Sequence, residues 1–161
     1  MNARLAVLDA LTRCRRNNAW SADVLDAVIK KYNLDTRDAA LTSAIFLGVL
    51  QNKSLCDYYI NFYCPHKLEP QVRDILRIGT YQLVFMDKIP ARAAVDECVK
   101  LSNRRTSGLI NAVLRQIAEN NTSLPQVQAS GTASHLSFQI EAFPDSPALP
   151  STPVLPKVGT V

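Results

Sequence analysis

The residues of this chain best suited to bind a ligand are arginines and lysines, several of which stand close together near the N-terminus. A guanidinium group presents a planar fork of N–H donors that matches a phosphate, and an ammonium group attracts the same anion. Arg4 and Arg15 are expected to reach outward from the edge of a helix. The full set of candidates for phosphate contacts is Arg4, Arg13, Arg15, Arg16, Lys30 and Lys31, with a smaller group at Arg104 and Arg105. The alternative is a solvated helix surface with no ligand.

Groups that can carry out covalent chemistry are sparse. The four cysteines are Cys14, Cys56, Cys64 and Cys98, and none stands beside an acid or base that would activate a thiol. We expect them to be reduced and buried. His66 and His135 stand apart, and the spacing of His66 from the cysteines matches no compact zinc pattern. We therefore predict no catalytic residue, no metal site and no cofactor in this chain.

Composition and charge are typical of a cytosolic protein. Apolar residues make up 47% of the chain, but no apolar run is long enough to span a bilayer. The first residues, MNARLAVLDALTRCRR, interleave charged and apolar side chains, which is not typical of a signal peptide. Residues 1–120 hold 17 Lys and Arg against 12 Asp and Glu. This modest excess of positive charge is compatible with a nucleic-acid partner but does not require one.

Hydrophobic periodicity predicts an all-α protein. We expect helices over about residues 3–16, 21–31, 35–51, 53–63, 70–86, 90–101 and 107–120, with Ser21 and Asp35 as N-caps. Gly48 and Gly79 fall inside two of these helices, where glycine costs about 1 kcal/mol relative to alanine. A close approach by a neighbouring helix would account for both. Short helices joined by short loops predict a bundle.

The composition changes abruptly near residue 121. From residue 121 to residue 161, 6 of 41 residues are proline, 10 are Ser or Thr, and only three are charged. Such a segment cannot bury enough apolar surface to offset its conformational entropy. We predict one helical domain over residues 1–120, followed by a disordered tail over residues 121–161. A further hypothesis is that the coding sequence is truncated or shifted in reading frame near residue 121.

Several stretches together resemble the NusB-like domain. They are AIFLGVL, the central ILRIGTYQL, the later IPARAAVDECVKL and the closing GLINAVLRQI, and the resemblance covers about residues 3–120. It implies a bundle of about seven short helices. The positions that match the family pattern are Gly48, Gly79, Tyr81, Pro90, Glu97, Asn111, Leu114 and Arg115. Asp96 departs from the pattern, which usually has Asn there, and Gln51 replaces an Arg common in the methyltransferase branch.

The closing helix and the short connection SNRRTS are most similar to the N-terminal domain of RsmB-type ribosomal RNA cytosine-C5 methyltransferases. This resemblance implies that the chain binds RNA, with ribosomal RNA as the expected substrate, and that Arg4 matches the family's N-terminal arginine. It also implies that S-adenosylmethionine and catalysis belong to a separate domain, so that this chain alone is not an enzyme. One alternative is a NusB-type transcription antitermination factor that binds boxA-like RNA and a ribosomal protein. A second is a helical bundle for protein interaction.

Two further groups of side chains raise structural questions. Asn111 is flanked by apolar residues, and we hypothesise that its amide bonds the backbone of a neighbouring helix near Glu97. The alternative places Asn111 on the exposed edge of its helix.

The aromatic residues Tyr58, Tyr59, Phe62 and Tyr63 can stack on RNA bases if they are exposed, whereas their helical spacing is more typical of a core.

Overall fold

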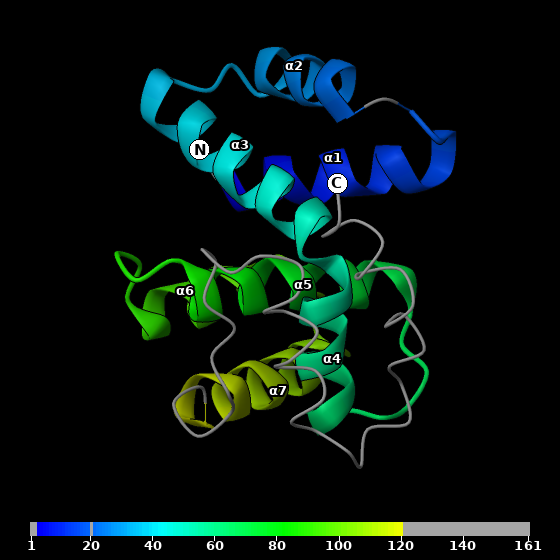
Figure 1. The fold of residues 1–161 in the computed structure, drawn as a ribbon, viewed down its shortest axis with the longest axis vertical. Helices are drawn as coiled ribbons and strands as arrows, with labels where there is room; N and C mark the ends of the chain where they lie inside the picture. The colour runs from blue at the N-terminus through cyan, green and yellow to red at the C-terminus, as the bar shows by residue number, and fades with distance from the viewer. Residues whose placement is uncertain (1–2, 20, 121–161) are drawn as a thin grey trace, which may run out of the picture. The chain divides into compact units, whose positions relative to one another are not determined.

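The computed structural model describes residues 3–19 and 21–120, and the regular secondary structure in these ranges is entirely helical (Figure 1). The helices are α1 (Ala3–Asn17), α2 (Ser21–Lys31), α3 (Thr36–Gln51), α4 (Lys53–Tyr63), α5 (Pro70–Phe85), α6 (Ala91–Lys100) and α7 (Ser107–Asn120). The predicted all-α class and the bundle are confirmed. The predicted tail, residues 121–161, lies outside the described residues. None of the described helices is long and apolar enough to cross a membrane.

The ends of the first three helices follow from polar side chains. The side chain of Asp35 accepts a hydrogen bond from the backbone N–H of Asp38 at 2.7 Å, which caps α3 as predicted. Asn18 and Asn33, just beyond α1 and α2, have φ angles of 49° and 48°. Asparagine tolerates this left-handed conformation better than most residues. The chain can therefore reverse direction after α1 and bring α2 back onto it.

Helix α5 is the centre of the described fold. It packs against α1, α3, α4 and α6, and Figure 1 shows it running across the middle of the helices. Its buried apolar side chains include Val72, Ile75, Leu76 and Ile78. Polar residues of α5 are buried as well. Most of these polar groups find hydrogen-bond partners, among them Asp74 and Gln82, whereas Oγ1 of Thr80 has none in the described residues.

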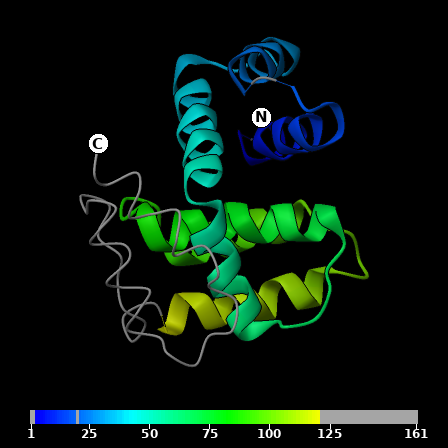
Figure 2. The same cartoon turned by 45° about the vertical axis from the view of Figure 1, so that its right-hand side comes forward.

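Two glycines permit the close contacts around α5. Gly48 on α3 faces the ring of Tyr81 on α5, and a Cβ atom at Gly48 would overlap that ring. Figure 2 shows α3 descending onto α5 before the chain continues into α4. At Gly79, a Cβ atom would lie 2.6 Å from Cδ2 of Leu114 on α7. The predicted close approach of a neighbouring helix is confirmed at both glycines.

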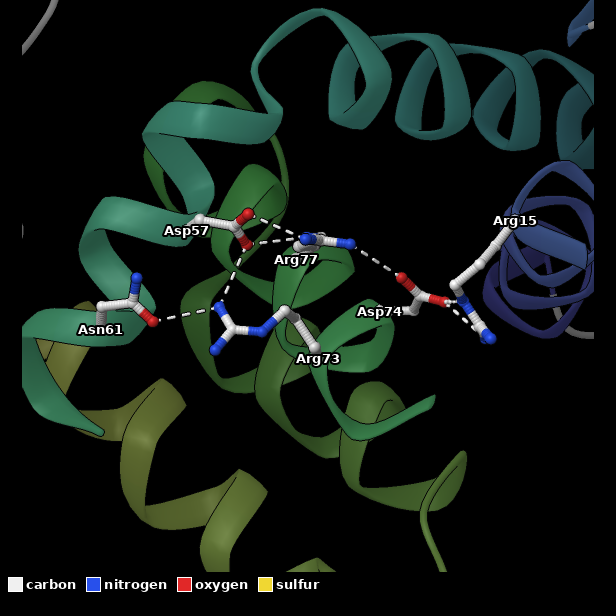
Figure 3. Close-up of polar contacts among 6 residues, drawn as sticks. All are labelled: Arg15, Asp57, Asn61, Arg73, Asp74 and Arg77. Carbon is white, nitrogen blue, oxygen red and sulfur yellow. Dashed lines mark hydrogen bonds and ion pairs between the residues drawn. The ribbon is translucent and has the colours of Figure 1, made fainter. Parts of the chain in front are cut away.

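A network of ion pairs joins α5 to α1 and α4 (Figure 3). Arg77 donates through Nε and Nη2 to the two carboxylate oxygens of Asp57 on α4, at 2.7 and 2.8 Å. Its Nη1 donates to Asp74 one turn earlier on α5, at 3.1 Å. Asp74 also accepts a hydrogen bond from Nη2 of Arg15 on α1 at 3.1 Å, and Arg73 donates to Asp57 at 3.3 Å. Three helices are thereby tied together by two carboxylates.

The centre of this network is shielded from water. The side chains of Asp74 and Arg77 are only 4% and 13% exposed. Burial opposes the positive charge of Arg77, but the hydrogen bonds and charges of Asp57 and Asp74 outweigh burial and raise the pKa of this guanidinium. Removing one member of a buried network leaves an opposite charge without its partner. The same change at an exposed ion pair costs little, because water replaces the partner.

Substituting Gly79→Ala tests the packing of α7 on α5. The added methyl group must displace the side chain of Leu114, which is fully buried. We expect the free energy of unfolding to fall by about 1–2 kcal/mol, despite the better helix propensity of alanine. Gly108→Ala is the matched control, since no atom lies within 4 Å of a Cβ there. Urea denaturation of both variants measures the difference, and equal effects would contradict the assigned contact.

Substituting Arg77→Met tests the ion-pair network. Methionine has similar bulk but leaves the carboxylates of Asp57 and Asp74 without their shared cation. We expect a loss of about 1–3 kcal/mol in the free energy of unfolding, because Arg73 still pairs with Asp57 and Arg15 with Asp74. The control is Arg92→Met, because Arg92 is 92% exposed and lies 3.7 Å from its partner Asp96. Its expected cost is below about 0.5 kcal/mol. A mild effect of Arg77→Met would show that water can reach the network.

Candidate nucleic-acid interface

The arginines of the first helix do not form one cluster, because the structure divides them between two sides of α1. Arg4 donates through Nε to Oε1 of the buried Gln82 at 3.0 Å, and Arg15 donates to Asp74. Both residues therefore bond side chains of α5, which the sequence did not predict, although the side chain of Arg15 remains 37% exposed at the edge of α1. The physical reason is that α5 presents buried polar groups to this side of α1, and these groups need partners.

Arg13 and Arg16 lie on the other side of α1, where Lys31 at the end of α2 joins them. We call these three residues the α1–α2 basic face. Asp9 lies between two of them. Its Oδ1 accepts a hydrogen bond from Nε of Arg13 at 3.1 Å, and its Oδ2 accepts one from Nζ of Lys31 at 2.8 Å. Arg16 is exposed and stands two helical turns from Asp9 along the same side. The ammonium of Lys31 also lies 4.9 Å from the centre of the Tyr32 ring.

The electrostatics of the α1–α2 basic face favour an anionic ligand. Burial alone would favour the neutral form of Asp9, but hydrogen bonds from Lys31 and Arg13 outweigh it and lower the pKa of the carboxyl. The hydrogen bond to Asp9 uses only Nε of Arg13, so its two terminal amino groups contact no acceptor in the described part of the chain. Two cations share the carboxylate of Asp9 and a third, Arg16, lies exposed on the same side of α1, so the face keeps a net positive charge.

The remaining candidates lie outside the α1–α2 basic face. Lys30 is exposed and pairs with Asp26 on its own helix at 2.7 Å. Arg104 and Arg105 are exposed in the connection between α6 and α7. The side chain of Asn103 accepts the backbone N–H of Arg105 at 3.0 Å and thus gives this connection a defined turn. The structure brings Arg13, Arg16 and Lys31 together and leaves the other candidates at separate positions.

Five charged residues with structural roles were not among the predicted site residues. They are Asp9, Asp57, Arg73, Asp74 and Arg77. A signal for the last three exists in the segment QVRDILRIGTYQL, where charged residues interrupt an otherwise apolar central helix. Charged residues at such positions are almost never buried unless they are paired. The identity of the partners could not be read from the sequence, because Asp57 and Arg15 are distant along the chain.

Several residues of the family pattern make contacts within the fold. Pro90 directly precedes α6, and Glu97 pairs with Lys100 at 2.6 Å. The hypothesis that Asn111 bonds a neighbouring helix is wrong. Its Oδ1 accepts a hydrogen bond from Nε of Arg115 on the same helix at 3.0 Å, in an exposed position. An i,i+4 partner satisfies the amide locally, as the edge alternative requires.

The thiols and aromatic residues are mostly part of the core. Cys56, Cys64 and Cys98 are buried and all four cysteines are free, as expected, whereas Cys14 is only partly buried. Burial raises the pKa of Cys56 and of Cys98 to about 12, so neither is a thiolate near neutral pH. Tyr59 is buried, which fits the core interpretation. Phe62 is 59% exposed and packs edge-to-face on Tyr63, with 5.0 Å between ring centres.

Comparison with known proteins connects this fold and surface to one family. Residues 1–119 match the NusB family. A probable ribosomal RNA small subunit methyltransferase B of Bacillus subtilis is 34% identical over 122 residues, which cover 72% of this chain and 27% of that protein. A transcription antitermination protein NusB of Caldicellulosiruptor saccharolyticus is 31% identical over 96 residues, which cover 55% of this chain and 73% of that protein.

A solved structure shows the same architecture. T. maritima NusB superimposes with a TM-score of 0.66 at 25% identity, covering 73% of this chain and 88% of that one. The chain thus spans about a quarter of the methyltransferase relatives and most of the NusB structure. The sequence match, the order of the helices and the structural similarity agree, and the chain belongs to the NusB family.

Proposed function

We propose that the chain binds RNA through the α1–α2 basic face, as a substrate-binding domain of the small-subunit ribosomal RNA methyltransferase type. The observation that carries the proposal is the convergence of Arg13 and Lys31, from two helices, on the carboxylate of Asp9, with the exposed Arg16 on the same side of α1. Similarity to relatives named for ribosomal RNA methylation supports RNA as the ligand. The RNA phosphates would meet guanidinium and ammonium donors that face solvent.

Phosphate binding by this face has a definite physical signature. A protein that neutralises RNA phosphates releases the cations condensed on the RNA. The affinity therefore falls as salt rises, with a slope of about −0.7 per phosphate contact on a single strand in a double-logarithmic plot. Three cations predict a slope near −2 for this face alone. Contacts from Arg104 and Arg105 would make the dependence steeper.

In this proposal the chain contributes RNA binding and no catalytic step. S-adenosylmethionine and the attack on the cytosine base belong to a catalytic domain of such a methyltransferase, which this chain does not cover. That domain is a partner under this proposal, whether it is on the same polypeptide or another. The cysteines of this chain fit a structural role, since burial holds the pKa of Cys56 and Cys98 at about 12.

The second candidate is a transcription antitermination factor that binds boxA-like RNA together with a ribosomal protein. It is favoured by the coverage of 88% of the T. maritima NusB chain and by relatives named as antitermination proteins. The two candidates share the RNA-binding face and differ in the protein partner. Affinity purification distinguishes them: recovery of a ribosomal protein with RNA polymerase supports antitermination, and recovery of a methyltransferase domain supports the first candidate.

The double substitution Arg13→Glu with Arg16→Glu tests the RNA-binding face. We expect the affinity for a single-stranded small-subunit ribosomal RNA fragment to fall at least about tenfold, and the salt slope to flatten by about 1.4. Fluorescence anisotropy at several salt concentrations measures both quantities. The matched control is Lys88→Glu with Arg92→Glu, which changes the net charge equally. Figures 1 and 2 show that the α5–α6 connection lies on the opposite side of the fold from the C-terminal end of α1.

The outcomes separate the possible roles. Equal losses in both double variants would mean that only net charge matters and that the α1–α2 basic face is not the site. No loss in either, with a shallow salt dependence in the wild type, would favour the protein-interaction bundle. A corresponding Arg104→Glu, Arg105→Glu variant shows whether the α6–α7 connection takes part.

A further inference from the structure

We infer that Asp9 is a positioning residue of the RNA-binding face: its carboxylate holds Arg13 and Lys31 in the arrangement in which they bind one RNA phosphate. This inference rests on the proposed function and deepens it. It assigns to an acidic residue in the middle of a basic surface a favourable role in binding a polyanion. The simpler expectation is that such a residue weakens RNA binding by repulsion.

The geometry gives each cation its own oxygen. Oδ1 of Asp9 accepts from Nε of Arg13 at 3.1 Å, and Oδ2 accepts from Nζ of Lys31 at 2.8 Å. Both nitrogen atoms thus touch one small anionic group, so a second group of similar size can bridge the same two cations. The donors that do not bond Asp9 are the terminal amino groups of Arg13 and the N–H groups of Lys31 beyond the one on Oδ2, with Tyr32 beside the ammonium. A phosphate can therefore add to the arrangement without displacing Asp9.

Asp9 is suited to this role because it is itself fixed and ionised. Its side chain is only 19% exposed and extends from a helix whose opposite side is pinned to α5 by Arg4 and Arg15. The hydrogen bonds from Lys31 and Arg13 lower its pKa against the effect of burial, so it remains charged at any pH used for RNA binding. Its contact with Lys31 is also a direct side-chain link between α1 and α2.

Removing the carboxylate has two opposing effects on RNA binding. Arg13 and Lys31 would repel each other and their long side chains would spread over many rotamers, which binding must then restrict at an entropic cost. Loss of a negative charge would at the same time increase the attraction of the face for RNA. If Asp9 positions the two cations, its removal weakens the RNA complex. If Asp9 only repels the RNA phosphates, its removal makes the complex tighter. The sign of the change therefore decides between them.

The test compares Asp9→Asn with Asp26→Asn in the full chain, using the same single-stranded ribosomal RNA fragment. Asp26 is the matched control, because it is 65% exposed and pairs only with Lys30 on its own helix. We expect Asp26→Asn to bind RNA as tightly as the wild type or up to about twofold tighter. We expect Asp9→Asn to bind about three- to tenfold more weakly. Its salt slope should flatten by about 0.7, the loss of one phosphate contact.

Circular dichroism and thermal melting establish that each variant is folded. Should Asp9→Asn fail to fold, Asp9→Glu replaces it, since it keeps the charge but moves the carboxylate by one methylene group. Weaker binding with a flatter slope is again the expected result. Binding by Asp9→Asn that equals or exceeds that of Asp26→Asn overturns the positioning role, while the proposed function stands. Absence of RNA binding by the wild type overturns the proposed function itself.

Discussion

The bidentate ion pair between Arg77 and Asp57 is the interaction on which the arrangement of the helices depends. Helix α5 is packed on several sides, yet it carries a cation at a position that is almost fully enclosed. Such a charge is tolerated only with carboxylate partners in good geometry. One partner comes from α4, and the other, Asp74, comes from α5 itself and extends the pairing to Arg15. The position of α1 on α5 follows from this requirement.

The two sides of α1 show how environment assigns different roles to the same residue type. Toward α5, the guanidinium groups of Arg4 and Arg15 meet buried polar acceptors and contribute to the architecture. Toward α2, Arg13 meets a carboxylate at the surface and keeps donors available. Charge alone does not distinguish these arginines, because all are cations on one helix. The distinction is the partner's burial, which decides whether water can compete for the guanidinium.

The helices, the Asp35 cap of α3 and the two packing glycines could be predicted from the sequence because their signals are local. Hydrophobic periodicity, the Asp35 cap and the energetic cost of Gly48 and Gly79 each depend on a few neighbouring residues. The division of the arginines could not be predicted, because the acceptor for Arg15 stands 59 positions along the chain. The candidate site was accordingly predicted as one cluster, whereas the structure splits it.

The error at Asn111 has a different origin. The apolar neighbours of Asn111 in sequence suggested a buried amide with a partner on another helix. The nearest partner positions on a helix surface are three or four residues away, and Arg115 stands at one of them as a hydrogen-bond donor. The family pattern contains both residues, so their pairing was readable from the sequence. A polar residue beside apolar neighbours is best compared first with its own i,i+4 positions and only then with distant segments.

Helix α1 is held on α5 differently from the way α2 is held on α1, and this difference indicates where RNA binding can alter the structure. Helix α1 is fixed to α5 by the pair of Arg15 with the buried Asp74 and by the hydrogen bond of Arg4 to the buried Gln82, so RNA binding has little to change there. Helix α2 is joined to α1 through a turn at Asn18, apolar contacts and the contact of Lys31 with Asp9. In the proposed complex a phosphate bridging Arg13 and Lys31 strengthens this junction. Because linkage is reciprocal, whatever holds α2 against α1 in the free protein also favours RNA binding, and RNA stabilises the same contact in return.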